Sequence, residues 1–143
     1  MKIKKIIALV LTLSMMSSST IIANASTADS DLPEKYVSTS ITVYSNWRAK
    51  ENSTSHYIYN LAKQEIRVYS YSDKGINRTV NGSAIIPYLS QRLIRNTIWE
   101  RYADGTETSN RCRLAIKGTI PAVNVQLAGV WSPDSVGNYP VAN

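Results

Sequence analysis

The run NRCRLAIKGTI, residues 110–120, alternates apolar and basic side chains and decides the fold class. Because successive side chains of a strand point to opposite sides, its apolar members share one face and its basic members the other. The apolar set is Cys112, Leu114, Ile116 and Ile120, and the basic set is Arg111, Arg113 and Lys117. A second inward set follows at Val123, Val125, Leu127 and Trp131. These patterns predict two half-buried strands.

Three earlier runs are rich in Val, Ile, Thr and Tyr and suit a pleated sheet better than a helix. They are residues 38–47, 56–61 and 65–72. Residues that tolerate a positive φ, as hairpin turns require, come after them. These are Asp73-Lys74-Gly75, Asn81-Gly82 and Asp104-Gly105. We therefore expect an all-β fold, a single antiparallel β-sandwich or open barrel of about seven strands.

The segment from Ser90 to Ala103 fits two structures. Ser90 suits a helix cap, Ile94, Ile98 and Tyr102 repeat at the spacing of a helix, and Gly105 suits its end. A helix would, however, place polar side chains in the apolar arc, whereas a strand leads directly into the Asp104-Gly105 turn. The interpretation adopted here is a strand.

The first 25 residues have the three parts of a secretory signal peptide. Lys2, Lys4 and Lys5 give a cationic start, residues 6–13 are apolar, and Ala23-Asn24-Ala25 puts small residues where signal peptidase needs them. Serines interrupt the apolar stretch before it reaches the roughly 20 residues of a membrane span. We expect cleavage before Ser26, secretion to the extracellular space and no stable membrane anchor in the mature protein.

The remainder is long enough for one core, and we expect one domain. Residues 26–35 are rich in Ser, Thr, Ala and Asp and are predicted to be a flexible lead. The β domain is predicted over 36–135 and a C-terminal tail over 136–143. A single cysteine, Cys112, cannot form an intramolecular disulfide.

Cleavage would lower the formal net charge from +6 to +3, because 13 Lys and Arg then face 10 Asp and Glu. This mild excess favours an anionic cell-wall polymer as partner, with another envelope protein as the alternative. The basic residues are dispersed and form no nucleic-acid-binding arm, so no nucleic acid is expected.

Catalytic constellations are missing from the sequence pattern. His56 is the only histidine, so no pair of histidines can hold a metal. Cys112 faces inward by strand alternation, where a thiol is inert. Only Glu100 lies in a run apolar enough to perturb its pKa, and glycoside hydrolysis needs two carboxyl groups. We expect no enzyme, no catalytic residues, no cofactor and no metal.

Aromatic residues are the remaining candidates for a binding surface. Two tyrosine pairs at spacing two lie on adjacent predicted strands, so each pair would share a sheet face, and such a ladder can stack on sugar rings or line an interface. The candidate residues are Tyr57, Tyr59, Tyr69 and Tyr71, with Trp131 and Asp134 at a possible binding tip. For the last two the interpretation adopted here is structural, a core tryptophan followed by a turn at residues 132–135 in which Asp134→Ala should be mild, and the binding tip is the alternative.

The segment Gly129-Val130-Trp131-Ser132-Pro133-Asp134-Ser135 resembles the ending of a family of small, uncharacterised, secreted proteins of Gram-positive bacteria. Residues 94–100 and 76–79 are similar to weaker motifs of that family, and the resemblance covers roughly residues 56–135. It implies a secreted β-rich domain without assigned activity or catalytic residues.

Taken together, these features predict a secreted, non-enzymatic β-domain that acts by binding at the cell envelope or in the medium. The alternative is a secreted, bacteriocin-like effector that acts on membranes, since an exported basic β-protein suits that role.

Overall fold

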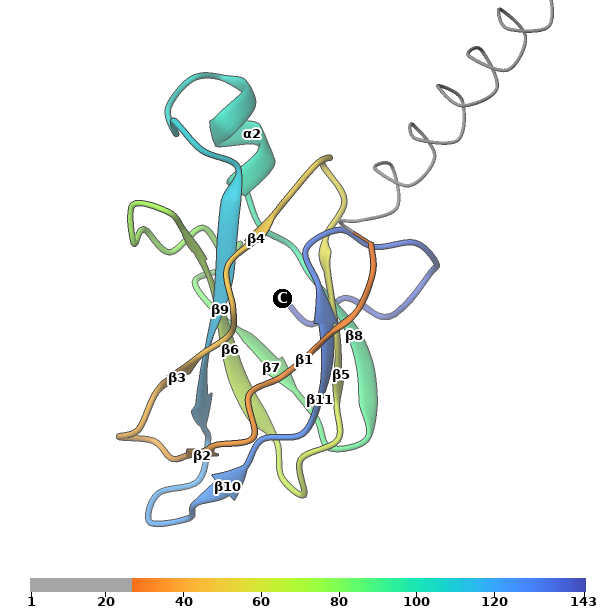
Figure 1. The fold of residues 1–143 in the computed structure, drawn as a ribbon. Coiled ribbons are helices and arrows are strands. Elements are labelled where there is room, and N and C mark those ends of the chain that lie inside the picture. Colours follow the sequence, from red (N-terminus) through yellow and green to blue (C-terminus); the bar gives the residue numbers. More distant parts are fainter. Residues whose placement is uncertain (1–26) are drawn as a thin grey trace, which may run out of the picture.

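The computed structural model describes residues 27–143 and shows two antiparallel sheets that face each other, with a short ribbon at one end (Figure 1). The first, the β5 sheet, has the order β1 (Ser30–Asp31), β11 (Gly129–Ser132), β5 (His56–Asn60) and β8 (Ser90–Ile94). The second, the β9 sheet, has the order β3 (Val43–Tyr44), β9 (Arg111–Gly118), β6 (Ile66–Ser72) and β7 (Ala84–Ile86), and β4 (Arg48–Ala49) also pairs with β9. The ribbon joins β2 (Tyr36–Val37) and β10 (Val125–Gln126). The predicted all-β class is confirmed, and within residues 27–143 no sheet closes into a barrel.

The core lies between the two sheets because each contributes the buried side of an alternating strand. β6 and β9 pair along their length, from Ile66 opposite Gly118 to Ser72 opposite Cys112. Every second residue of both strands is buried, as the sequence pattern requires. The fully buried apolar side chains include Ile58, Ile66, Val68, Ile94, Leu114, Ile116 and Trp131.

The second inward run is not one strand, as predicted, but two. Val125 and Leu127 are buried with the ribbon, and Trp131 is buried in the β5 sheet. Gly129, with a φ of 128°, separates the two parts. The chain comes so close to the Tyr59 carbonyl oxygen here that a Cβ would stand 1.9 Å from it, so only glycine fits. Ile120, predicted to face inward, is 43 % exposed because β9 ends at Gly118.

The ambiguous segment forms both a strand and a helix, so the prediction of a continuous strand is wrong for its second half. β8 covers its start, and α2 (Ile98–Ala103) follows. The Asn96 side chain accepts the Ile98 N–H at 3.3 Å, and Ile98 is fully buried against the core. Gly105, at a φ of 82°, follows the helix instead of closing a hairpin.

The lead and the tail contact the β domain, although neither was predicted to be part of it. β1 pairs with β11, and Leu32 is only 3 % exposed. At the other end Val141 bridges Leu93, and the Asn143 side chain donates to the Val80 carbonyl at 2.7 Å. The predicted signal peptide, residues 1–25, lies outside the described residues. Among residues 27–143 no helix is long and apolar enough to span a bilayer.

Candidate functional site

The six candidate residues do not form one surface. Tyr57 and Tyr59 lie on the outer side of the β5 sheet, because their neighbours on β5 are buried. Tyr69 and Tyr71 lie on the outer side of the β9 sheet. Trp131 and Asp134 are fully buried. Each tyrosine pair shares one face of its sheet, but the two pairs face away from each other and do not form a common surface.

The C-terminal segment occupies part of the outer side of the β5 sheet. The rings of Tyr57 and Tyr139 have their centroids 4.9 Å apart. The Tyr57 hydroxyl donates to the Gln91 side chain at 3.0 Å. Tyr57 is thus engaged within the molecule, which leaves the pair on the β9 sheet as the more available one.

Aromatic rings and guanidinium groups alternate on the outer side of the β9 sheet. The guanidinium carbon of Arg113 lies 4.1 Å from the ring centroid of Tyr44 and 4.5 Å from that of Trp47. The guanidinium carbon of Arg111 lies 5.4 Å from the same tryptophan ring. These distances are those of cation–π contacts, which order the arginines on the sheet. The aromatic–arginine face comprises Tyr44, Trp47, Tyr69, Tyr71, Arg111 and Arg113.

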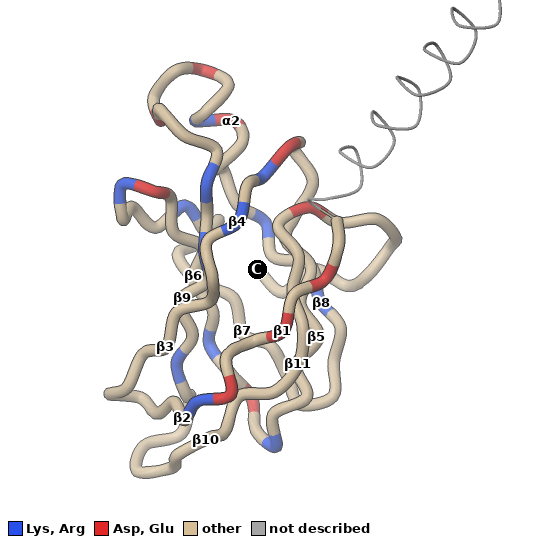
Figure 2. Tube along the Cα trace, in the orientation of Figure 1, with Lys and Arg blue, Asp and Glu red and all other residues tan. Residues whose placement is uncertain are grey.

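Strand register extends this face across β6 and β9. Tyr71 stands opposite Arg113, and the ring centroids of Tyr71 and Tyr69 are 6.4 Å apart. Farther along, Arg67 stands directly opposite Lys117, an arrangement of like charges that weakens strand pairing. Figure 2 shows the basic positions along these two strands. The acidic partner nearby is Asp73, whose carboxylate is 3.8 Å from Arg111.

The chemistry of this face favours oxyanions attached to rings or polyols. A guanidinium group presents a planar fork of N–H donors that matches phosphate and carboxylate oxygens. Stacking on Tyr44 and Trp47 restricts Arg113, so less rotamer entropy is lost when a ligand binds. Tyrosine adds a flat apolar ring with a polar tip, which suits sugars. The face is therefore equipped for an anionic, partly apolar ligand.

Asp134 lies inside the fold and pairs with a buried lysine. Lys50 Nζ is 2.7 Å from Asp134 Oδ1, and neither side chain is exposed. The same nitrogen donates to the carbonyl oxygen of Thr54 and, at 2.8 Å, to that of Pro133. Asp134 Oδ2 accepts the Glu51 N–H at 2.7 Å. Burial lowers the pKa of Lys50, against the opposing effect of Asp134. The Lys50 cluster comprises Lys50, Thr54, His56, Pro133 and Asp134.

His56 is a fully buried member of this cluster. Its Nδ1 is 2.7 Å from the Pro133 carbonyl oxygen, and its Nε2 is 2.6 Å from Ser70 Oγ. Because a carbonyl oxygen only accepts, Nδ1 carries the proton and Nε2 accepts from the serine. Burial, helped by the Lys50 charge, lowers the pKa of His56 to about 3. The ring of Trp131 meets it edge-on at 5.7 Å. The histidine is a neutral structural group at physiological pH.

Cys112 is buried on β9, as its place in the alternating run predicted. Burial raises the pKa of its thiol to about 12, so the nucleophilic thiolate is scarce at neutral pH. Neither this thiol nor His56 is presented to a substrate. Within residues 27–143 no group of His, Cys, Asp and Glu side chains is arranged to hold a metal ion.

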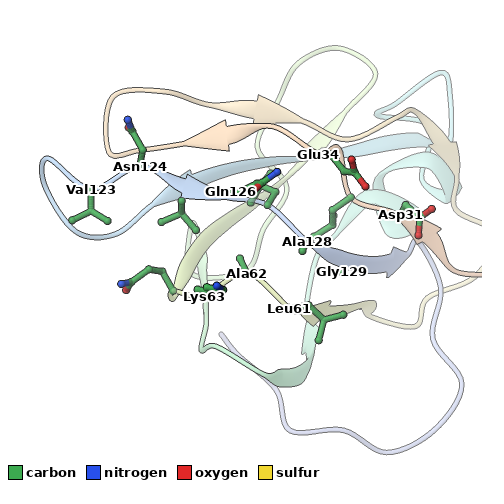
Figure 3. A pocket seen from close by; sticks show the side chains of 14 residues that line it. Asp31, Glu34, Leu61, Ala62, Lys63, Val123, Asn124, Gln126, Ala128 and Gly129 are labelled. Carbon is green, nitrogen blue, oxygen red and sulfur yellow. The ribbon is translucent and has the colours of Figure 1, made fainter.

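A hollow of about 700 Å³ lies at the ribbon end of the molecule (Figure 3). Its charged lining side chains are Asp31, Glu34 and Lys63, and most of the rest are small, apolar or amide side chains. Asp31 and Glu34 come from one wall, and Lys63 and Leu61 from another. The excess of carboxylates gives the hollow the wrong sign for an anionic ligand, in contrast to the aromatic–arginine face.

Sequence reasoning missed Tyr44, Trp47 and Lys50. The alternation around Arg111 and Arg113 placed both arginines on one outward face, but the aromatic rings beside them come from β3 and the segment before β4, which pair with β9 from far away in the sequence. Lys50 has no local sign of burial. Its partner follows the last strand, and no periodic pattern joins the two.

Residues 18–135 match the model of a protein family described as "Protein of unknown function (DUF2712)". The matched segment includes both the aromatic–arginine face and the Lys50 cluster. No curated protein and no solved structure matches the chain.

Proposed function

We propose that this chain, which belongs to the DUF2712 family, is a secreted, non-enzymatic domain that binds an anionic polymer of the cell envelope through the aromatic–arginine face. One observation carries the proposal. The outward positions of β6 and β9 hold basic, aromatic and small side chains, and no carboxylate. They are Arg67, Tyr69, Tyr71, Arg111, Arg113, Ala115 and Lys117.

The like charges on this face lower the stability of the free protein, and a bound anion would offset this effect. Arg67 and Lys117 repel each other across the strands, and an oxyanion placed between them would turn this repulsion into two attractions. Arg111 and Arg113 are two residues apart on one strand, so their Cα atoms are about 7 Å apart. Two anionic groups of one linear polymer can therefore be held at the same time.

An envelope polymer is favoured over a nucleic acid by the predicted export of the chain. The signal peptide predicted at residues 1–25 supports export, and so does the resemblance of the Trp131 to Ser135 segment to the ending of a secreted Gram-positive family. Anionic wall polymers combine phosphate or carboxylate groups with sugars or polyols. The stacked arginines suit the first component and the tyrosines the second.

Binding without catalysis is supported by the state of the candidate nucleophile and base. Cys112 is buried and protonated, and His56 is buried with both ring nitrogens in hydrogen bonds. A general base must reach the proton that it removes, and His56 is enclosed between the sheets.

The test is direct binding of the purified protein to soluble poly(glycerol phosphate), measured by calorimetry at low and at physiological salt. We expect saturable binding that weakens as salt screens the charges. Arg111→Gln combined with Arg113→Gln should lower the affinity at least about tenfold, which corresponds to about 1.4 kcal/mol. Trp47→Ala should also lower it, because the arginines lose their stacking partner.

The matched control removes the same charge elsewhere. Lys74 and Arg101 each have a side chain that is 47 % exposed, and neither contributes to the aromatic–arginine face. The Lys74→Gln and Arg101→Gln double variant should bind nearly as the wild type does. If both double variants lost the same affinity, the net charge of the protein would explain the binding and the aromatic–arginine face would not be required. Tighter binding of single-stranded DNA than of the wall polymer would contradict the proposed ligand.

Exposed apolar residues favour a membrane-active effector as the second candidate. Six of the eleven exposed large apolar residues within residues 27–143 belong to β2, to the loop before β3 and to the segments that follow β5, β7 and β9, toward the ribbon end of the sandwich (Figure 1). The residues are Tyr36, Ile41, Leu61, Tyr88, Leu89 and Ile120. Large exposed apolar side chains at one end of a domain suit contact with lipid. Release of dye from anionic vesicles by the wild type, and its loss in Tyr88→Ser with Leu89→Ser, would support this candidate over polymer binding.

A further inference from the structure

The Lys50 cluster brings an amine against a carboxyl group in the interior of the sandwich. Lys50 directly follows β4 in the β9 sheet, and Asp134 follows β11 in the β5 sheet. Their side chains meet at 2.7 Å with no exposed surface on either. Separate buried charges are costly, and a buried pair recovers the cost only through near-ideal partners. A proton transfer that makes both groups neutral would remove this cost.

Proton transfer within the pair gives a neutral amine and a neutral acid. A neutral amine has two hydrogens and one lone pair. In the charged form the carbonyl oxygens of Thr54 and Pro133 accept two hydrogens, and Asp134 Oδ1 accepts the third at 2.7 Å. Transfer of this third proton to Oδ1 leaves the lone pair on the side of the carboxyl group. Burial lowers the pKa of Lys50 and so favours this form. The backbone thus orients a nucleophile at the carboxyl group.

The carboxyl group is polarised from the opposite side. The Glu51 N–H donates to Asp134 Oδ2 at 2.7 Å, where negative charge would develop if the carboxyl carbon were attacked. Oδ1, which is next to Lys50 Nζ, also has the Thr54 hydroxyl 3.4 Å away. One oxygen is therefore held as a carbonyl, and the other is placed to depart.

We propose that Lys50 and Asp134 form an intramolecular isopeptide bond, by condensation of Lys50 Nζ with the Asp134 carboxyl carbon. The nitrogen lone pair attacks the carbon, Oδ2 carries the developing charge, and the bond from the carbon to Oδ1 breaks. The nitrogen loses one proton, which goes to the departing hydroxyl, so the products are one amide and one water. No oxidant or other reactant is needed. Fixed contact between the groups replaces the chemical activation that free amines and acids require.

The surroundings also accommodate the product. An amide nitrogen keeps one hydrogen, which Thr54 can still accept. The Pro133 carbonyl loses the lysine hydrogen but keeps the His56 Nδ1–H donor at 2.7 Å. Glu51 and Thr54, which contact the pair through their backbone, are exposed residues, so the released water has a short way to solvent. No buried polar group of the cluster is left without a partner by the reaction.

The other lysine pair of the described chain provides an internal comparison. Lys74 Nζ lies 3.9 Å from Glu107 Oε2, and its side chain is 47 % exposed. Water solvates this amine, and at 3.9 Å it is not in close contact with the carboxylate. Lys74 should remain free, although it too faces a buried carboxyl group.

The experiment is intact-mass measurement of the purified wild-type protein under denaturing conditions, followed by digestion and peptide sequencing. We expect a mass lower than that of the unlinked chain by one water molecule, and a branched peptide that joins Lys50 to Asp134. Lys50→Arg should have its full mass. Asp134→Asn should react with loss of ammonia in place of water, so the linked product has the wild-type mass.

A wild-type protein of full mass would overturn the proposal, and because this result needs no variant, misfolding of a variant cannot obscure it. Loss of water at another place, such as a cyclised aspartate, would overturn it as well, since the branched peptide would then be missing. A link at Lys74 would show that proximity alone is enough, and would contradict the role assigned to burial.

Discussion

His56 couples the stability of the protein to pH. Its pKa is about 3 in the folded state and 6.5 in its ordinary state, so the unfolded chain binds the proton more readily. The contribution of the neutral His56 to stability is therefore fully present above pH 6.5 and is lost as the pH is lowered toward 3. Between pH 7 and 5 the free energy of unfolding should fall by about 2 kcal/mol.

Urea unfolding at both pH values checks this, with His56→Gln as the control. The variant has no imidazole to protonate, and its stability should change much less across the same interval. Carboxyl groups contribute little there because their ordinary pKa values lie below it. Equal changes in the two proteins would show that His56 does not have the buried, neutral role described above.

Asp134 is the second residue whose replacement should have a large effect. The sequence favoured a turn residue that tolerates alanine, but the structure shows it compensating the fully buried Lys50. Asp134→Ala should lower the free energy of unfolding by about 3–5 kcal/mol, because it leaves an amine buried without its partner. Denaturant unfolding measures this, and Asp104→Ala at an exposed pair should have little effect.

A double variant separates the lost partner from the lost volume. Lys50→Met with Asp134→Leu leaves no buried amine without a partner and should recover a large part of the stability that Asp134→Ala loses. If the double variant were the less stable of the two, burial of an uncompensated charge would not explain the effect of Asp134→Ala.

At the scale of elements, Gly129 sets the register of β11 against β5. A Cβ at this position would stand 1.9 Å from the Tyr59 carbonyl oxygen, so Gly129→Ala must push the two strands apart. The cost should be about 3 kcal/mol or more, at the upper end for an overpacked site. Gly75→Ala is the control, since Gly75 also has a positive φ but no atom within 4 Å of the added carbon. Its cost should be about 1–2 kcal/mol. Thermal unfolding of both variants would show whether the close contact or the dihedral angle dominates.

Elements could be predicted where their pattern is local. The alternation through Cys112, Leu114 and Ile116 identified β9 and its buried side, because a period of two can be read from neighbouring residues. The break at Gly129 was not recognised, since one glycine does not reveal which backbone will approach it. In the ambiguous segment Ile98 suits the buried face of either a strand or a helix. The rest of the fold buries it at the start of α2, and this tertiary contact cannot be read from the local sequence.

At the scale of the whole molecule, sequence reasoning gave the class but not the neighbours. β5 and β6 are consecutive, and the sequence suggested that their tyrosines lie side by side. In the structure they belong to different sheets, so Tyr59 and Tyr69 lie on opposite sides of the sandwich. The aromatic–arginine face depends on the pairing of β3 and β4 with β9, and the Lys50 cluster depends on the packing of the two sheets. Neither contact follows from a local sequence pattern.

The pairing of β1 with β11 has a consequence for the time course of folding. β11 lies between β1 and β5, and it is the last strand that residues 27–143 contribute. β5 can pair with β8 earlier, but the β5 sheet cannot be completed until β11 has been made. Contacts between such distant parts of a chain also form slowly, on the scale of milliseconds to seconds. The order of the strands thus delays completion of the sandwich until its last strand has been made.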